Sequence, residues 1–105
     1  MDYSQLSDQE INLLVAKIQH HDKTFIESKT RSPSVVMLNH INMWIDYCNN
    51  PSDAWPIILS NRIGVVPGTA SDKWAAHYCN WDIAIADTNP LRAAMIVFLL
   101  MKGKK

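Results

Sequence analysis

Apolar residues near the start of the chain recur at the spacing of a helix. The repeat follows the i, i+3, i+4, i+7 pattern at Ile11, Leu14, Val15 and Ile18. Ser7 is a suitable N-cap, and Glu10 stands three residues later, which completes the sequence of a capping box. The pattern predicts a helix at residues 8–20, with Asn12 facing away from the apolar stripe.

In the middle of the chain, the helical pattern is replaced by short apolar runs. Residues 24–26 indicate a short strand, residues 29–34 read as a loop, and the apolar run 35–38 is too short to assign by its period. Residues 41–47 then alternate between apolar and polar side chains. This period of two predicts a strand with one buried face.

Two Asn-Pro pairs, Asn50–Pro51 and Asn89–Pro90, each precede a run of small and apolar residues. Asn accepts a backbone N–H as an N-cap, and Pro suits the first helical position because its missing N–H has no partner there. The pairs therefore predict two further helices. One runs from about residue 51 to 61, and the other begins near residue 89.

The first of these two helices has two candidate starts. If Asp53 is the N-cap, Pro56 falls at the third helical position and removes no intrahelical bond. If Asn50 is the N-cap, Pro56 lies deeper and the helix should kink. Either start places one group of side chains near a common face: Ala54, Trp55, Ile58 and Leu59.

Three short runs between these helices predict strands, at residues 63–66, 73–79 and 83–85. Pro67–Gly68 fits the central positions of a type II turn, in which Gly supplies the positive φ. The order of elements predicts an α+β fold, with three helices packed on a small, mostly antiparallel sheet.

The last helix is apolar nearly all round, so it must be covered on several sides. Two arrangements satisfy this requirement. In the favoured one, the segment is the central helix of the fold. In the other, one of its sides packs on a second copy of the chain.

Composition narrows the class of protein. With 105 residues, 48% of them hydrophobic, the chain is expected to form one domain spanning residues 1–105. Its 10 basic and 10 acidic side chains cancel, so it lacks the broad positive field of a protein that binds phosphates. Neither a signal peptide nor a membrane-spanning run is evident, which predicts a cytoplasmic protein with reduced thiols and no membrane partner.

Few residues suggest chemistry. A zinc site would draw on the scattered set His40, Cys48, His77 and Cys79, which lacks the close cysteine pairs typical of zinc sites. A thiol nucleophile would need Cys79 beside His77, and side chains two apart on a strand rarely make that contact. No P-loop, nucleophile elbow or dinucleotide turn occurs. We therefore expect no catalytic residues, no metal and no cofactor.

Three segments together resemble the NinX-like proteins of tailed phages and prophages. They are the opening residues 1–12, the segment Asp46–Ile58 with its Asn-Asn-Pro, and the segment Asn89–Phe98. A more distant similarity to small phage proteins suggests an α/β/α sandwich-like arrangement. The resemblance implies a phage or prophage accessory protein, located in the cytoplasm of the bacterial host. It carries over no catalytic residues, because the function of the family is not established.

Neutral charge, many aromatic and Met side chains and no catalytic set favour a non-enzymatic module that binds a phage or host protein, as a monomer or homodimer. Trp44 and Trp55 are expected in the core. The candidate binding residues are Tyr47, Asn49, Asn50, Trp74 and Trp81. The alternative is a nucleic-acid adaptor or regulator that uses the basic residues Lys23, Lys29, Arg31 and Lys102. A small metal- or thiol-dependent enzyme is the third, least favoured class.

Overall fold

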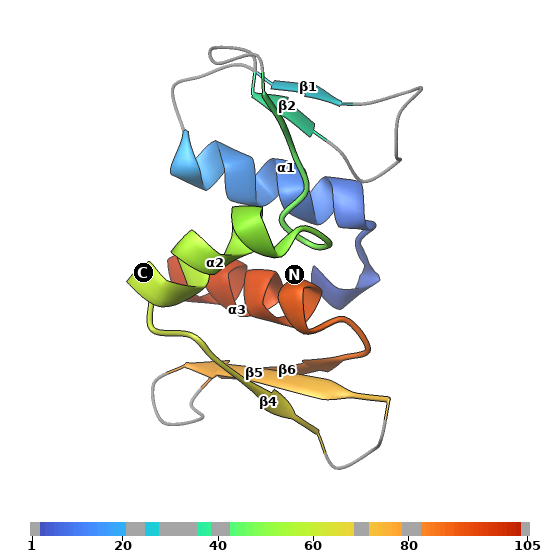
Figure 1. Cartoon of the computed structure of the whole chain (residues 1–105), viewed down its shortest axis with the longest axis vertical. Helices are drawn as coiled ribbons and strands as arrows, with labels where there is room; N and C mark the ends of the chain where they lie inside the picture. The colour runs from blue at the N-terminus through green and yellow to red at the C-terminus, as the bar shows by residue number, and fades with distance from the viewer. Residues whose placement is uncertain are drawn as a thin grey trace.

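A computed structural model describes residues 3–20, 25–27, 36–38, 43–68, 72–78 and 83–103 (Figure 1). The elements follow in the order η1 (Tyr3–Gln5), α1 (Asp8–Gln19), β1 (Phe25–Glu27), β2 (Val36–Leu38), β3 (Met43–Ile45), α2 (Pro51–Ser60), β4 (Gly64–Pro67), β5 (Trp74–Tyr78), β6 (Ile83–Asp87) and α3 (Pro90–Gly103). Three helices with antiparallel sheet confirm the predicted α+β class.

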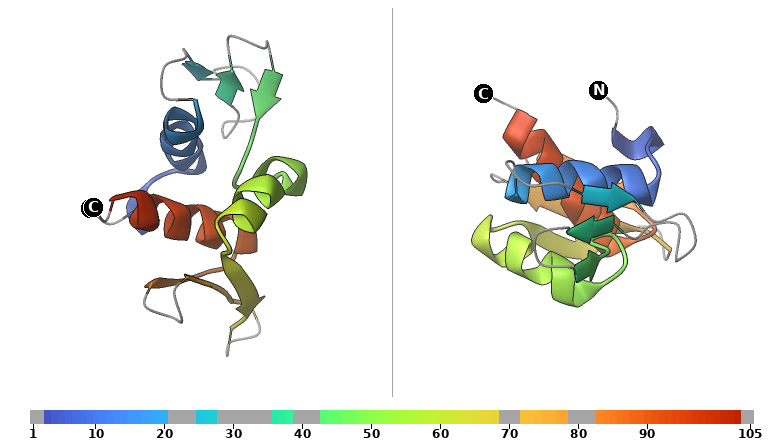
Figure 2. Two further views of the ribbon diagram at one scale, coloured as in Figure 1. Left: turned by 90° about the vertical axis from the view of Figure 1, so that its left-hand side faces the viewer. Right: turned by 90° about the horizontal axis from the view of Figure 1, so that it is seen from above.

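The strands form two sheets of three antiparallel strands, in the orders β1-β2-β3 and β4-β5-β6. The helices lie between the two sheets, as Figures 1 and 2 show from different sides. The layers therefore differ from an α/β/α order, in which helices would cover both faces of one sheet. The reason is that β1 and β2 pair with β3 instead of extending the sheet formed by β4, β5 and β6.

Helix α3 lies at the centre of the molecule. It packs on β5 and β6 on one side, and on α1 and α2 on the other (Figure 2). Every residue from Ala93 to Leu99 is buried, which explains why the helix is apolar nearly all round. The predicted central helix is confirmed. No helix of the described ranges combines the length and the apolar character that crossing a bilayer requires.

The capping box predicted for α1 is present. The backbone N–H of Glu10 donates to Ser7 Oγ at 3.1 Å, and the Ser7 N–H donates to Glu10 Oε1 at 2.9 Å. The prediction for Asn12 was wrong, because this side chain is fully buried and does not face away from the core. Its amide is accepted in the interior because it is hydrogen-bonded there, as described below.

Helix α2 begins with Asn50 as its N-cap, which decides between the two candidate starts. The side-chain oxygen of Asn50 accepts the N–H of Ser52 at 3.0 Å, and Pro51 occupies the first helical position. Pro56 therefore lies inside the helix, where it offers no N–H to the carbonyl four residues before it.

The buried face of α2 differs from the predicted one. The buried side chains are Ala54, Ile57 and Ile58, whereas Trp55 and Leu59 are 54% and 59% exposed. The expectation that Trp55 lies in the core was therefore wrong. Both faces satisfy the helical period, and the structure places the two isoleucines inward.

The sheet β4-β5-β6 is in register through cross-strand pairs such as Ala76 with Ile85. The type II turn predicted at Pro67–Gly68 was wrong, since no described glycine has a positive φ. The N–H of Gly68 instead donates to the Lys73 carbonyl at 2.9 Å, so a longer connection joins β4 to β5. The loop expected at residues 29–34 lies outside the described residues.

Candidate functional site

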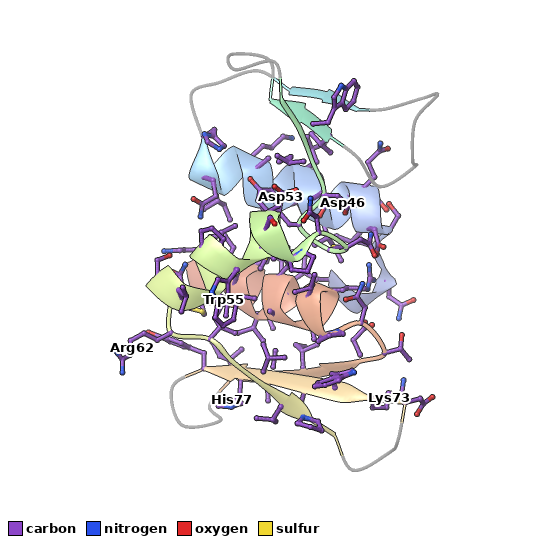
Figure 3. The ribbon with its side chains drawn as sticks, viewed as in Figure 1. Asp46, Asp53, Trp55, Arg62, Lys73 and His77 are labelled. Atoms are coloured by element: carbon purple, nitrogen blue, oxygen red, sulfur yellow. The ribbon has the colours of Figure 1, made fainter. Side chains whose placement is uncertain are left out.

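Asn12 ties α1 to the turn that follows β3. Its Nδ2 donates to Asp46 Oδ1 at 2.7 Å, and its Oδ1 accepts the N–H of Cys48 at 3.0 Å. The turn itself is closed by the Asn50 N–H, which donates to the Asp46 carbonyl at 2.8 Å. Asp53 Oδ2 accepts the Asp46 N–H at 2.9 Å, so α2 holds the turn from its other side (Figure 3).

Arg92 connects the first turn of α3 to the first turn of α1. Its guanidinium donates to Asp8 Oδ1 at 2.6 Å, to the Leu6 carbonyl at 2.6 Å and to Asp87 Oδ2 at 3.2 Å. The Arg92 side chain is only 13% exposed. This partly buried guanidinium holds three segments of the chain together, and its donors are directed at the protein rather than at a ligand.

The Asn residues of both Asn-Pro pairs cap helices as predicted. Asn89 Oδ1 accepts the N–H of Leu91 at 2.9 Å, and Asn89 Nδ2 donates to the Cys48 carbonyl at 2.6 Å. Asn49 is exposed, but its amide donates to Asp8 Oδ2 at 3.1 Å. These contacts within the chain explain Asn49 and Asn50 through folding, and their role in binding a partner stays a prediction.

Tyr47 and Cys48 follow Asp46 into the core. Burial, with Asp53 as the second cause, raises the pKa of Tyr47 to about 12. Burial also raises the pKa of the Cys48 thiol, and the nearby Asp8 carboxylate adds to this shift. Cys48 is a free, buried thiol held in its protonated form, which suits a core residue better than a nucleophile.

The metal and thiol-enzyme hypotheses involve residues that the structure places only in part. Within the described ranges, no group of three or more His, Cys, Asp or Glu is arranged to hold a metal ion. His40 and Cys79 lie outside those ranges, so neither hypothesis is tested by the geometry.

Large apolar side chains are exposed at several places on the described surface. They are Ile18, Trp55, Leu59 and Trp74. Trp74, a predicted binding residue, is 37% exposed and stands opposite Pro67 at one end of the β4–β5 pair. Trp81, the other predicted tryptophan, lies outside the described residues.

Trp55 and Leu59 flank a surface hollow of about 400 Å³, which we call the α2 hollow. Its lining residues come from α2, the chain that leaves it, and the β4–β5 pair: Trp55, Ile58, Leu59, Arg62, Ile63, Gly64 and His77. Figure 3 shows Trp55 on α2, with Arg62 beyond the end of the helix and His77 on the sheet. None of the lining residues that the structure describes is a carboxylate, and the walls they form are largely apolar.

The far wall of the α2 hollow depends on a glycine. Gly64 pairs with His77 in the β4–β5 register, and a Cβ at position 64 would overlap the His77 imidazole. The missing side chain thus lets the imidazole lie against the backbone of β4. A substitution at Gly64 would displace His77 and reshape this wall.

The end of α2 sets the position of Arg62. The N–H of Ile63 donates to the Ile58 carbonyl at 3.1 Å, and the N–H of Arg62 donates to the Leu59 carbonyl at 3.2 Å. This pair of bonds is a Schellman motif, in which the residue after the C-cap adopts the left-handed conformation. Arg62 has φ 56°, so an arginine occupies a position where Gly is usual.

A comparison with protein families identifies the chain. The sequence model of the family described as Bacteriophage P22, NinX matches residues 2–102. The chain belongs to the NinX family. The resemblance seen in the sequence is thereby confirmed, and the chain is a member of a phage protein family. No curated protein matches this NinX-family chain, and no solved structure does.

The nucleic-acid alternative for this NinX-family chain rests on four basic residues, of which only Lys102 is described. Its ammonium lies 5.5 Å from the centroid of the Phe98 ring, at the end of α3. Lys23, Lys29 and Arg31 lie outside the described residues. Whether the four gather on one face is therefore untested, and this function stays a prediction.

Proposed function

We propose that this NinX-family chain is a non-enzymatic phage accessory protein that binds another protein through the α2 hollow. The observation that carries the proposal is that Trp55 and Leu59, on one face of α2, are each more than half exposed. Burial of large apolar side chains is the main favourable term in protein association. Tryptophan is enriched among the few interface residues that supply most of the binding energy.

The surroundings of these two side chains support the same function. Ile58 and Ile63 are buried and pack beneath the hollow, so the binding surface would rest on the rigid core. The lining carries little charge, which is typical of the centre of a protein interface rather than of its rim. A volume of about 400 Å³ accepts one or two large side chains of a partner.

Quantitative affinity capture from cells in which the phage genes are expressed tests this function. We expect specific partner proteins to be retained by the native chain and lost with Trp55→Ala and Leu59→Ala. Ile18→Ala is the matched control, because it removes another exposed apolar side chain, from α1. All three variants should fold normally, since surface substitutions usually change stability by less than about 0.5 kcal/mol.

Two results would contradict the proposal. One is the retention of the same proteins, in the same amounts, by native chain and by Trp55→Ala. The other is the absence of any specifically retained protein at near-native abundance. Loss of binding in Trp74→Ala, with Trp55→Ala unaffected, would move the interface to the other end of the β4–β5 pair.

A further inference from the structure

We infer that the α2 hollow recognises a peptide segment of the partner in which an apolar side chain is followed closely by a carboxylate. The apolar side chain would enter the hollow between Trp55 and Leu59, and the carboxylate would pair with Arg62. This inference rests on the proposed protein-binding function and specifies the chemistry of the partner.

The apolar part of the site is formed by four side chains with different roles. Trp55 and Leu59 stand at the rim and are exposed, whereas Ile58 and Ile63 are only 4% and 6% exposed. An apolar side chain placed in the hollow would therefore contact hydrocarbon on several sides. This contact is favourable because it removes the apolar surface of that side chain from water.

Arg62 supplies the polar part of the site. Among the described residues that line the hollow, Arg62 is the one with a formal charge, and none of them is a carboxylate that could neutralise it. Across the described part of the chain, its guanidinium forms no ion pair and no hydrogen bond. Arg92 differs in this respect, since its donors are used by Asp8, Asp87 and Leu6. No described residue occupies the Arg62 donors, and the planar geometry of these donors matches a carboxylate of a ligand.

The backbone at Arg62 gives a separate reason to assign this side chain a role. With φ 56°, the residue is in the left-handed region, where a side chain is unfavourable and Gly is not. Folding stability alone would therefore favour Gly at the end of α2. Backbone strain of this kind is concentrated at functional sites. The arginine costs stability and places a cation at the rim of an apolar hollow.

Charge and shape together select this partner over a nucleic acid. Recognition of a phosphate backbone uses several cations in a row, whereas the described part of the lining offers one formal positive charge beside apolar walls. One cation next to a hollow of this size complements a single carboxylate adjoining a large apolar side chain. A short peptide segment can present a carboxylate and a large apolar side chain next to each other.

Selection from a displayed library of short random peptides on the folded chain tests the inference. We expect the retained peptides to carry Leu, Met, Phe or Trp within a few residues of Asp or Glu. Synthetic copies should bind the native chain and lose binding to Trp55→Ala. They should bind Arg62→Gly about tenfold more weakly, although that variant should unfold at a higher temperature than the native chain.

A double-mutant cycle separates a direct ion pair from an indirect effect. Replacing the peptide carboxylate by its amide should weaken binding to the native chain about tenfold, and should cause no further loss with Arg62→Gly. Ile18→Ala, which removes an exposed apolar side chain from α1, is the matched control and should bind the peptides like the native chain. Added salt should weaken native binding more than binding to Arg62→Gly.

The outcomes are distinct. One outcome is that the selected peptides lose binding to Trp55→Ala, yet contain no preferred acidic residue and bind Arg62→Gly as well as the native chain. In that case the protein-binding function stands and this inference is wrong. If no retained peptide depends on Trp55, both are wrong. Binding of an oligonucleotide that Arg62→Gly abolishes, without peptide binding, would overturn the inference in favour of a nucleic-acid ligand.

Discussion

Replacing Asn12 with alanine should unfold this protein at a much lower denaturant concentration. Asn12 is fully buried, and both ends of its amide are used. The substitution leaves the N–H of Cys48 without its acceptor in the core. It also removes the 2.7 Å bond to Asp46 Oδ1, where the longer bond from Asn49 at 3.2 Å remains.

The magnitude follows from these contacts. An unsatisfied buried N–H costs about 1–3 kcal/mol, and a lost hydrogen bond to a carboxylate about 1 kcal/mol when another donor remains. Alanine returns about 0.6 kcal/mol of helix propensity. The net loss in the free energy of unfolding is about 1.4–3.4 kcal/mol. For a chain of this length, that lowers the melting temperature by roughly 6–27 °C.

Urea unfolding followed by far-ultraviolet circular dichroism measures this loss. Gln19→Ala is the matched control, because Gln19 is an exposed residue of the same helix. It should change the free energy of unfolding by less than about 0.5 kcal/mol. Asn12→Ala could instead prove as stable as Gln19→Ala, with the same dependence on urea. In that case the hydrogen bonds of Asn12 to Asp46 and Cys48 do not stabilise the fold.

Three further outcomes follow from the same region. The pKa of Tyr47 is raised to about 12 by burial and by Asp53, so the folded state keeps a proton that the unfolded state releases. The free energy of unfolding should therefore fall as pH rises from about 10 to about 12, and less steeply in Tyr47→Phe, as urea titrations across that range would show. In the same assay, Asn50→Ala should lower the free energy of unfolding by about 1 kcal/mol, because it removes the N-cap of α2. Asn89→Ala should lower it further, because this substitution also removes the donor to the Cys48 carbonyl. In a variant whose other cysteine is replaced, iodoacetamide should alkylate Cys48 much more slowly in the folded chain than in urea. Equal rates would contradict the burial of the Cys48 thiol.

Helix positions in this protein were predictable because their starts depend on local chemistry. Ser7 and Glu10 form a capping box within four residues, and Asn50 and Asn89 cap the residues that follow them. The choice between Asn50 and Asp53 as N-cap could not be made locally. It depends on Asp53 being engaged with the Asp46 N–H, a contact across the turn.

The errors arose where tertiary contacts decide the outcome. The helical period identifies an apolar stripe, but it cannot reveal that the polar Asn12 has partners in the turn after β3. The same period allowed Trp55 on the buried face of α2, whereas packing on α3 places Ile57 there. The strands near residues 25 and 37 are too short for sequence to specify their partners, so a second sheet was not foreseen.

The α2 hollow was missed for the same reason. The size of Trp55 favours a place in the core, and no pattern around Arg62 distinguishes it from other surface residues. One clue was available, since a helix predicted to end near residue 61 is followed by arginine where glycine is usual. The prominence of Asn49 and Asn50 pointed instead to residues that the structure shows engaged in contacts within the chain.

The central position of α3 has a consequence for how the protein folds while it is synthesised on the ribosome. Helix α3, which both α1 and the sheet β4-β5-β6 pack against, follows these elements in the chain and is synthesised after them. Until it emerges, the apolar faces of the earlier elements have nothing to cover them, and nascent chains in this state are prone to aggregate. Translation that stalls before Pro90 should thus leave a chain that needs a chaperone.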